Sequence, residues 1–319
     1  SSNWGLFVGQ LDMDGSSILN ACNNHGIAGI LIGGGGVIQG GAKLNCSNND
    51  YIGLYVYLDR DHGWFGDVVI EPGATVTACE NAFSGVPNAY KLQIEGTVIA
   101  DSNKVFGITN DAGDKLIITS TADVSACQNL VFGIFNYDNA NLTVKSGASL
   151  KVEENTGSGI LNGRNATLNL NAGSIQRNNA RYAIQGYVAH GGGIQNWGTA
   201  TLSDDVELYN NHTATCGDDI YNADGATITF GDTGKGWALD GAPDCYDDID
   251  GWYDDSANSR WNAHAEDEAD LHTVQVKPGT FNSVLALKAA HPPIGTLIIS
   301  KAIAGAGALE PDDCLTDFN

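Results

Sequence analysis

Acidic side chains in two short stretches are the first candidates for chemistry in this 319-residue sequence. They are Asp59, Asp61, His62 and Asp67, then Asp204, Asp205 and Glu207. Paired carboxylates do the general acid–base work of enzymes that cleave sugar polymers. These acids would therefore suit a polysaccharide lyase or glycoside hydrolase, which is kept as an alternative function without an assigned catalytic residue. Acids in loops are more often solvated or bound to calcium than catalytic.

Calcium is the one cofactor that the acidic residues suggest. One candidate is the stretch from Asp12 to Gly15, and the other is the cluster Asp247, Asp248, Asp250, Asp254 and Asp255. Carboxylate oxygens are the ligands that Ca²⁺ prefers, but neither stretch follows the 12-residue calcium loop. We therefore expect no required cofactor. The seven cysteines show no Cys-x-x-Cys or Cys/His spacing typical of zinc.

Aromatic and large apolar residues form the second set of candidates, for binding rather than catalysis. The predicted ligand-binding residues are Tyr55, Trp64, Phe135, Leu161, Tyr182, Tyr187, His190, Trp197 and Tyr221. Their positions have meaning only within the repeats that must place them.

A Gly-Ile-x-Asn phrase recurs along the chain and predicts stacked structural units. Its heads are Gly53, Gly85, Gly107, Gly133, Gly159, Gly193 and Asp219, at steps of 32, 22, 26, 26, 34 and 26 residues. An asparagine stands four residues before five heads, at Asn49, Asn81, Asn103, Asn129 and Asn155. Nine residues after most heads an apolar segment begins, for example at Leu142.

Apolar residues alternate with polar ones inside each unit, as in Leu142 and Val144, which is the period of a half-buried strand. A unit this short cannot bury its own apolar face, whereas stacked units can. We therefore predict an all-β parallel β-helix with coils of about 22–26 residues. The head asparagines should form a ladder at a corner where the backbone is left-handed: Asn110, Asn136, Asn162, Asn196 and Asn222.

The repeats predict three segments along the chain. Residues 1–230 should form the β-helix, and the acid- and tryptophan-containing residues 231–295 should cap it, because a solenoid needs a cap against end-to-end pairing. Residues 296–319 should be a linker or the start of a truncated stalk domain. The opening residues contain no initiator methionine and no leader peptide, so we expect a processed segment.

Two insertions interrupt the repeat and predict loops that carry function. About six extra residues fall within 58–67 and about ten within 180–190. The x residue of each phrase should face outward between these loops, which gives the column Tyr55, Pro87, Thr109, Phe135, Leu161, Gln195 and Tyr221. This column predicts either an apolar binding groove or a second small core covered by a loop or the terminal segment.

Outward positions on the other two strands argue against an enzyme. The expected columns are Gln93, Thr143, Asn169, Ser203 and Thr229, and Thr75, Asp123, Ser149, Ser174 and Asp205. Carboxylates do not follow one another in neighbouring coils of either column. Enzymes on β-helices need such neighbours, so we expect that this protein is not an enzyme.

Cysteine positions also follow the repeat. Cys22, Cys79 and Cys127 share the phrase Ala-Cys-x-Asn, which places them two coils, or roughly 9–10 Å, apart in one column. This separation exceeds the roughly 7 Å limit of a disulfide, so we expect packed thiols. Cys216 and Cys245 remain a possible bridge.

Residues 191–196, 198–212 and 218–230 resemble the right-handed parallel β-helix repeats of Gram-positive cell-wall-anchored surface adhesins, and more distantly those of chlamydial polymorphic outer-membrane proteins. The segment "IISKAIAG" at 298–305 is similar to the first strand of pilin-type, immunoglobulin-like stalk domains. That resemblance implies an isopeptide bond at Lys301 in such a domain, but the partner strand is missing from this sequence. It further implies an extracellular protein of the bacterial cell surface.

Charge and composition narrow the partners. The formal net charge of −23 disfavours nucleic acid and anionic membrane surfaces, and no apolar run reaches the roughly 20 residues that span a bilayer. We therefore expect a monomer that binds a host-surface, mucus or dietary glycan or glycoprotein through its aromatic residues.

Overall fold

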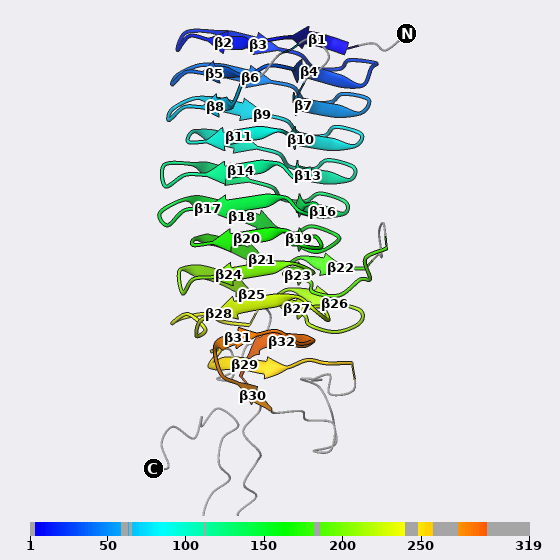
Figure 1. Cartoon of the computed structure of the whole chain (residues 1–319), viewed down its shortest axis with the longest axis vertical. Coiled ribbons are helices and arrows are strands. Elements are labelled where there is room, and N and C mark those ends of the chain that lie inside the picture. The colour runs from blue at the N-terminus through cyan, green and yellow to red at the C-terminus, as the bar shows by residue number, and fades with distance from the viewer. Residues whose placement is uncertain are drawn as a thin grey trace, which may run out of the picture.

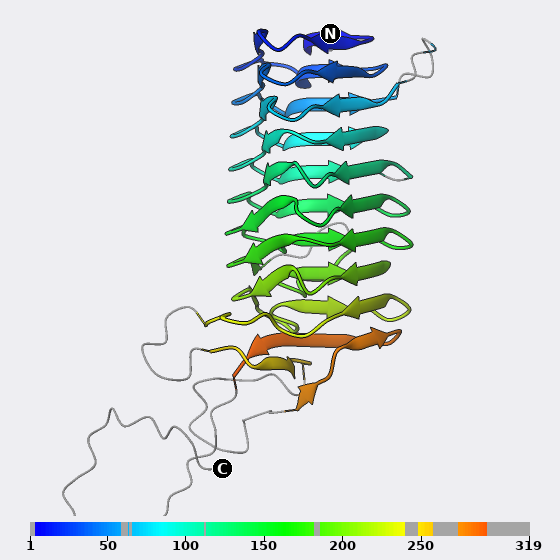
Figure 2. The same cartoon turned by 90° about the vertical axis from the view of Figure 1, so that its left-hand side faces the viewer.

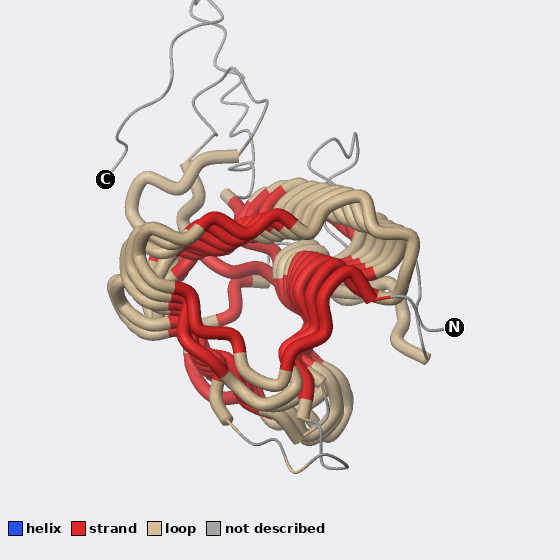
Figure 3. The backbone as a smooth tube through the Cα atoms, turned by 90° about the horizontal axis from the view of Figure 1, so that it is seen from above, coloured by secondary structure: helices blue, strands red, loops and turns tan. Residues whose placement is uncertain are grey.

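The computed structural model describes residues 4–58, 63, 66–111, 113–181, 186–239, 248–257 and 274–291. This part of the chain contains strands and no helices, arranged as a stack of coils (Figures 1 and 2). Seen along the stack, the strands superimpose into three faces joined by loops (Figure 3). The prediction of an all-β parallel β-helix is confirmed.

Sheet A has twelve strands, of which the first nine run parallel and the last three antiparallel to their neighbours. The nine define about eight turns. They are β1 (Trp4–Val8), β4 (Ala28–Ile32), β7 (Ile52–Tyr57), β10 (Ser84–Ala89), β13 (Phe106–Asn110), β16 (Phe132–Asn136), β19 (Ile160–Asn162), β23 (Ile194–Asn196) and β27 (Ile220–Asn222).

Sheet B follows sheet A in every coil and has ten strands, the last of them antiparallel. The parallel strands are β2 (Leu11–Met13), β5 (Gly36–Ile38), β8 (Val68–Ile70), β11 (Lys91–Ile94), β14 (Lys115–Ile118), β17 (Asn141–Val144), β20 (Thr167–Leu170), β24 (Thr199–Leu202) and β28 (Thr227–Phe230).

Sheet C forms the third face and has eight parallel strands. They are β3 (Ile18–Asn20), β6 (Lys43–Asn45), β9 (Thr75–Thr77), β12 (Thr97–Ile99), β15 (Asp123–Ser125), β18 (Ser149–Glu153), β21 (Gly173–Gln176) and β25 (Val206–Tyr209). A small separate sheet pairs β22 (Asn179–Ala180) with β26 (His212–Thr213).

The core lies between the three sheets. It is built from the inward-facing side chains of the strands, which stack on their counterparts in neighbouring coils. Ile108, Ile134 and Ile160 are register partners in successive coils and are fully buried. Leu116 and Leu142 stack in the same way on sheet B. Each such side chain contributes roughly 1.5–3 kcal/mol of burial before entropy is subtracted, and only the neighbouring coil makes that burial possible.

The glycine of the repeated phrase leaves room for an asparagine of the next coil. A Cβ on Gly107 would lie 2.7 Å from Asn129 Nδ2 and 2.6 Å from the carbonyl oxygen of Gly133. Any larger residue would therefore displace a buried side chain. This close approach explains why glycine recurs before the core isoleucine.

The asparagines four residues before the heads form the first ladder. In each step the side-chain oxygen of one asparagine accepts hydrogen bonds from the backbone N–H and the amide of the asparagine one coil earlier, as Asn129 does from Asn103 at 2.9 and 3.1 Å. The ladder runs through Asn24, Asn49, Asn81, Asn103, Asn129, Asn155, Asn178 and Asn211. It ends at Asp219, whose Oδ1 accepts from Asn211 and whose Oδ2 accepts from the Ala289 N–H of the antiparallel end.

The head asparagines form the second ladder, as expected, but they are not themselves left-handed. Asn110, Asn136 and Asn162 end strands of sheet A, and each amide donates to the side-chain oxygen of the next, at 2.8 and 2.7 Å. Two left-handed residues, Asn139 and Asn165, lie in the turn three residues after Asn136 and Asn162. The other left-handed non-glycine residues come directly before the first ladder: Asn23, Asn48, Glu80, Ser102, Gln128, Glu154, Arg177 and Asn210. The expected left-handed conformation is thus found beside the two ladders and not at the head asparagines, because those asparagines end extended strands.

The last coil is closed by strands that reverse direction. These are β29 (Gly251–Asp254), β30 (Gln275–Val276), β31 (Gly279–Phe281) and β32 (Leu285–Ala290). β32 pairs antiparallel with β27, and β31 pairs antiparallel with β28. Trp237 and Trp252 fill the space beneath Phe230 at this end. Residues 296–319, including Lys301, lie outside the described part of the chain.

Candidate ligand-binding surface

The predicted outward column exists as a column of register partners on sheet A. Phe135 pairs with Thr109 and Leu161, and Gln195 pairs with Leu161 and Tyr221. The middle of the column is closed to solvent, since Phe135 and Leu161 are 0% exposed. Tyr55 and Tyr221, at the two ends, are half-buried.

Phe135 and Leu161 belong to a second hydrophobic core outside sheet A, which we call the covered aromatic cluster. Its buried members are Phe106, Val131, Phe132, Phe135, Leu161 and Tyr187, with Phe83, Val105, Tyr137 and Trp197 packed against them. Tyr137 stacks on Phe135 at 3.7 Å between ring centroids, and Tyr187 meets Phe135 edge-on at 5.9 Å. Of the two alternatives for this column, the covered core is the one that the structure shows at these positions.

The second insertion supplies the cover. Tyr187 lies 4% exposed over the cluster, and its hydroxyl donates to Asp138. The next residue, Val188, accepts a hydrogen bond from the Gln195 amide at 2.7 Å. Burial and the nearby Asp138 carboxylate raise the pKa of Tyr187 to about 12, so the hydroxyl stays protonated and remains a donor.

Three of the predicted residues form a half-exposed border beside this cover, which we call the aromatic edge: His190, Trp197 and Tyr221. The rings of His190 and Tyr221 are 4.3 Å apart, and those of Trp197 and Tyr221 are 6.2 Å apart. Burial lowers the pKa of His190, so its imidazole is neutral at neutral pH. The aromatic edge therefore combines apolar ring faces with polar ring atoms.

Arg164 was not predicted, although it completes this surface. Its guanidinium carbon lies 4.9 Å from the ring centre of Tyr187 and 5.0 Å from that of Trp197. A cation above an aromatic face is attracted by the ring quadrupole. Arg164 lies two residues after the head asparagine Asn162, in a corner turn, and that turn position is the only sequence signal for its role.

Several predicted residues cannot be placed. Trp64 and Tyr182 lie outside the described residues, as do Asp59, Asp61 and His62 of the first insertion. Cys245 also lies outside them, so a bridge to Cys216 stays a prediction. Cys22, Cys79 and Cys127 are free thiols whose sheet C columns place them two coils apart, as predicted.

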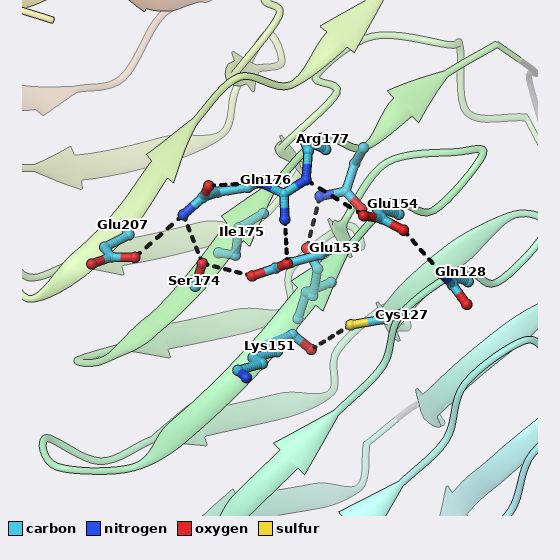
Figure 4. A network of polar contacts seen from close by, with 12 residues as sticks. Cys127, Gln128, Lys151, Glu153, Glu154, Ser174, Ile175, Gln176, Arg177 and Glu207 are labelled. Atoms are coloured by element: carbon cyan, nitrogen blue, oxygen red, sulfur yellow. Dashed lines mark hydrogen bonds and ion pairs between the residues drawn. The ribbon is translucent and has the colours of Figure 1, made fainter. Parts of the chain in front are cut away.

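A group of acids on sheet C is joined by ion pairs and hydrogen bonds (Figure 4). Arg177 holds Glu153 at 2.6 Å and Glu154 at 3.5 Å, while Gln176 donates to Glu207 at 3.2 Å. These carboxylates are tied to cations and amides along the left-handed corner, an arrangement that links neighbouring coils. Within the described residues this network has the character of a structural brace.

Two outward columns differ from the predicted ones. Asn169 pairs with Thr201, where Ser203 was expected, and Lys151 pairs with Ser174, where Ser149 was expected. Ser174 in turn pairs with Glu207, where Asp205 was expected. The first shift arises because the corner between β23 and β24 is shorter than the one between β19 and β20. The second arises because the corner between β20 and β21 is shorter than the one between β17 and β18. The corrected columns still place no two carboxylates in neighbouring coils of the described strands.

Of the acids proposed for calcium, Asp247 lies outside the described residues, and Asp12, Asp14 and Asp250 accept hydrogen bonds from protein groups. Asp14 accepts from Ser16 and Ser17, Asp12 accepts from the Val37 N–H, and Asp250 accepts from Tyr253. Among the residues that the structure describes, no three His, Cys, Asp or Glu side chains are grouped in a way that could hold a metal ion. The described residues also contain no helix long and apolar enough to cross a membrane.

The fold and these surfaces define a parallel β-solenoid with a second, external aromatic core. Comparison with known proteins adds no relative: no protein-family model matches the chain, and neither the curated proteins nor the solved structures contain a significant match.

Proposed function

We propose that this solenoid is the binding domain of an extracellular, Gram-positive cell-surface adhesin, and that its ligand is a host or dietary glycan or glycoprotein. The observation that carries the proposal is the aromatic edge, where half-exposed His190, Trp197 and Tyr221 are backed by a packed aromatic cluster. Preorganised aromatic faces bind sugars and protein partners without a large ordering cost. The resemblance of the repeats to adhesin repeats supports the same class.

The rigid coil stack suits this function. Two asparagine ladders and three continuous sheets hold every outward side chain at a fixed step of about 4.8 Å along the axis. A ligand that touches several coils would therefore meet a surface whose geometry is set before binding. This is a property of a display scaffold.

Binding of the purified protein to an array of host, mucus and dietary glycans tests the proposal. Tyr221→Ala and Trp197→Ala should remove most of the signal, with their folding checked by circular dichroism. Tyr57→Ala is the matched control, since Tyr57 is 41% exposed at the far end of the same sheet. Full binding by both edge variants, or equal loss in the control, would contradict the proposed surface.

The same samples address the alternative of a polysaccharide lyase or glycoside hydrolase. Release of reducing ends, or absorbance from unsaturated products, on incubation with diverse polysaccharides would favour an enzyme. The proposal expects binding without product.

A further inference from the structure

A cavity opens on the outer face of sheet B, on the side of the solenoid that follows sheet A in every coil. Its volume is about 210 Å³, and its lining residues are Asp67, Lys91, Leu92, Gln93, Lys115 and Ile117. Asp67 is the last residue of the segment 58–67, which holds the first insertion and in which the sequence predicts function.

Two lysines from neighbouring coils define the chemistry of this cavity. Lys91 and Lys115 are direct register partners on β11 and β14, and both are exposed. Like charges directly opposite each other in a sheet are destabilising. Asp67 offsets only one of them, because its carboxylate lies 3.3 Å from the Lys91 ammonium. Lys115 makes no ion pair within the described part of the chain.

The other polar lining group is Gln93, whose amide donates to Glu95. Asp67 is paired with the Lys91 ammonium, whereas Glu95 accepts from a neutral amide and is not among the lining residues. In a chain of net charge −23, the cavity has two ammonium groups to one carboxylate in its lining. This excess favours an anionic group between the lysines.

Beyond the cavity, the outward column of Lys91 and Lys115 and the outward column of Gln93 and Ile117 continue as hydroxyl and amide side chains. They are Asn141, Thr167, Thr199 and Thr227, and beside them Thr143, Asn169, Thr201 and Thr229. All are half-buried or exposed on the flat face of sheet B. They repeat about every 4.8 Å along the axis, which suits a polymer that presents many hydroxyl groups.

We infer that the outer face of sheet B binds an acidic polysaccharide, with a carboxylate of one sugar held between Lys91 and Lys115 and the following sugars lying over the threonine and asparagine columns. This inference deepens the proposed function and depends on it for the ligand class. It adds a second site, distinct from the aromatic edge.

Binding to polygalacturonate, with mannan as the neutral probe, tests the inference. Lys115→Gln should weaken polygalacturonate binding about tenfold, and added salt should weaken the wild-type interaction, because exposed charges are screened. Lys151→Gln is the matched control: it removes the same charge from an exposed lysine on sheet C and should leave binding unchanged.

Equal affinity of Lys115→Gln and wild type, an equal loss in Lys151→Gln, or no polygalacturonate binding by the wild type would overturn the inference. The proposed function has a separate readout. Glycan binding that depends on Tyr221 and not on Lys115 would sustain the adhesin proposal while removing the sheet B site.

Discussion

Replacing Asn129 by alanine tests the ladder that joins the coils. Asn129 is fully buried, and its side-chain oxygen accepts the Asn103 backbone N–H at 2.9 Å and the Asn103 amide at 3.1 Å. Alanine leaves both donors buried without an acceptor, at a cost of about 1–3 kcal/mol each. We therefore expect the free energy of unfolding to fall by about 4 kcal/mol.

Urea unfolding followed by circular dichroism measures this change. Asn141→Ala is the matched control, because Asn141 is an exposed asparagine on β17, and such surface changes usually stay within about 0.5 kcal/mol. If Asn129→Ala costs no more than Asn141→Ala, the ladder does not contribute to stability and the reasoning fails.

Asn129→Asp sharpens the test. Asn129 Nδ2 donates to Asn155 Oδ1 at 3.1 Å, so an ionised aspartate would place an oxygen against an oxygen there. Only the protonated form can donate, and burial also favours it, so the folded-state pKa of the new carboxyl should lie above its unfolded value of about 3.9. Stability should then be greatest below about pH 4 and fall as the pH rises. A flat pH profile relative to wild type would contradict this.

Three further outcomes are expected. Burial raises the pKa of Asp219 to about 7, above the unfolded value of about 3.9, so unfolding free energy should fall from about pH 4 to pH 7, and Asp219→Asn should flatten that decline in urea titrations. Phe135→Ala should cost about 3–5 kcal/mol in the same titrations, because it empties the covered aromatic cluster, whereas Tyr57→Ala should change little. Gln128→Gly should raise the melting temperature, because Gln128 has a φ of 57° and glycine adopts this conformation without steric cost; a lower melting temperature would argue against strain at this corner.

The repeated Gly-Ile-x-Asn phrase was enough to predict the fold, because its glycine, isoleucine and asparagine each have one structural role. Glycine admits the ladder asparagine, isoleucine fills the core, and the final asparagine bonds to its copy in the next coil. These tasks recur with the coil, so spacing alone reveals them. The separation of the three cysteines in sheet C followed from the same spacing.

The surface was harder to predict because it depends on segments that break the repeat. Nothing in the spacing indicates that Tyr187 and Val188 fold back over sheet A and close the column at Phe135 and Gln195. The shift from Ser203 to Thr201 likewise arises in one shortened corner. The lysine pair of sheet B becomes visible only when the register is known.

The central claim is that each near-copy of the phrase makes one turn about a common axis, and cysteine crosslinking tests it most directly. Thr97 and Asp123 are register partners in neighbouring coils, and Ser149 lies one coil beyond Asp123. A cysteine pair at 97 and 123 should oxidise readily, since register partners are about 4.8 Å apart, whereas a pair at 97 and 149, about 9–10 Å apart, should not. Peptide mapping that finds the 97–149 crosslink, or fails to find the 97–123 crosslink, would contradict the stacked-coil account.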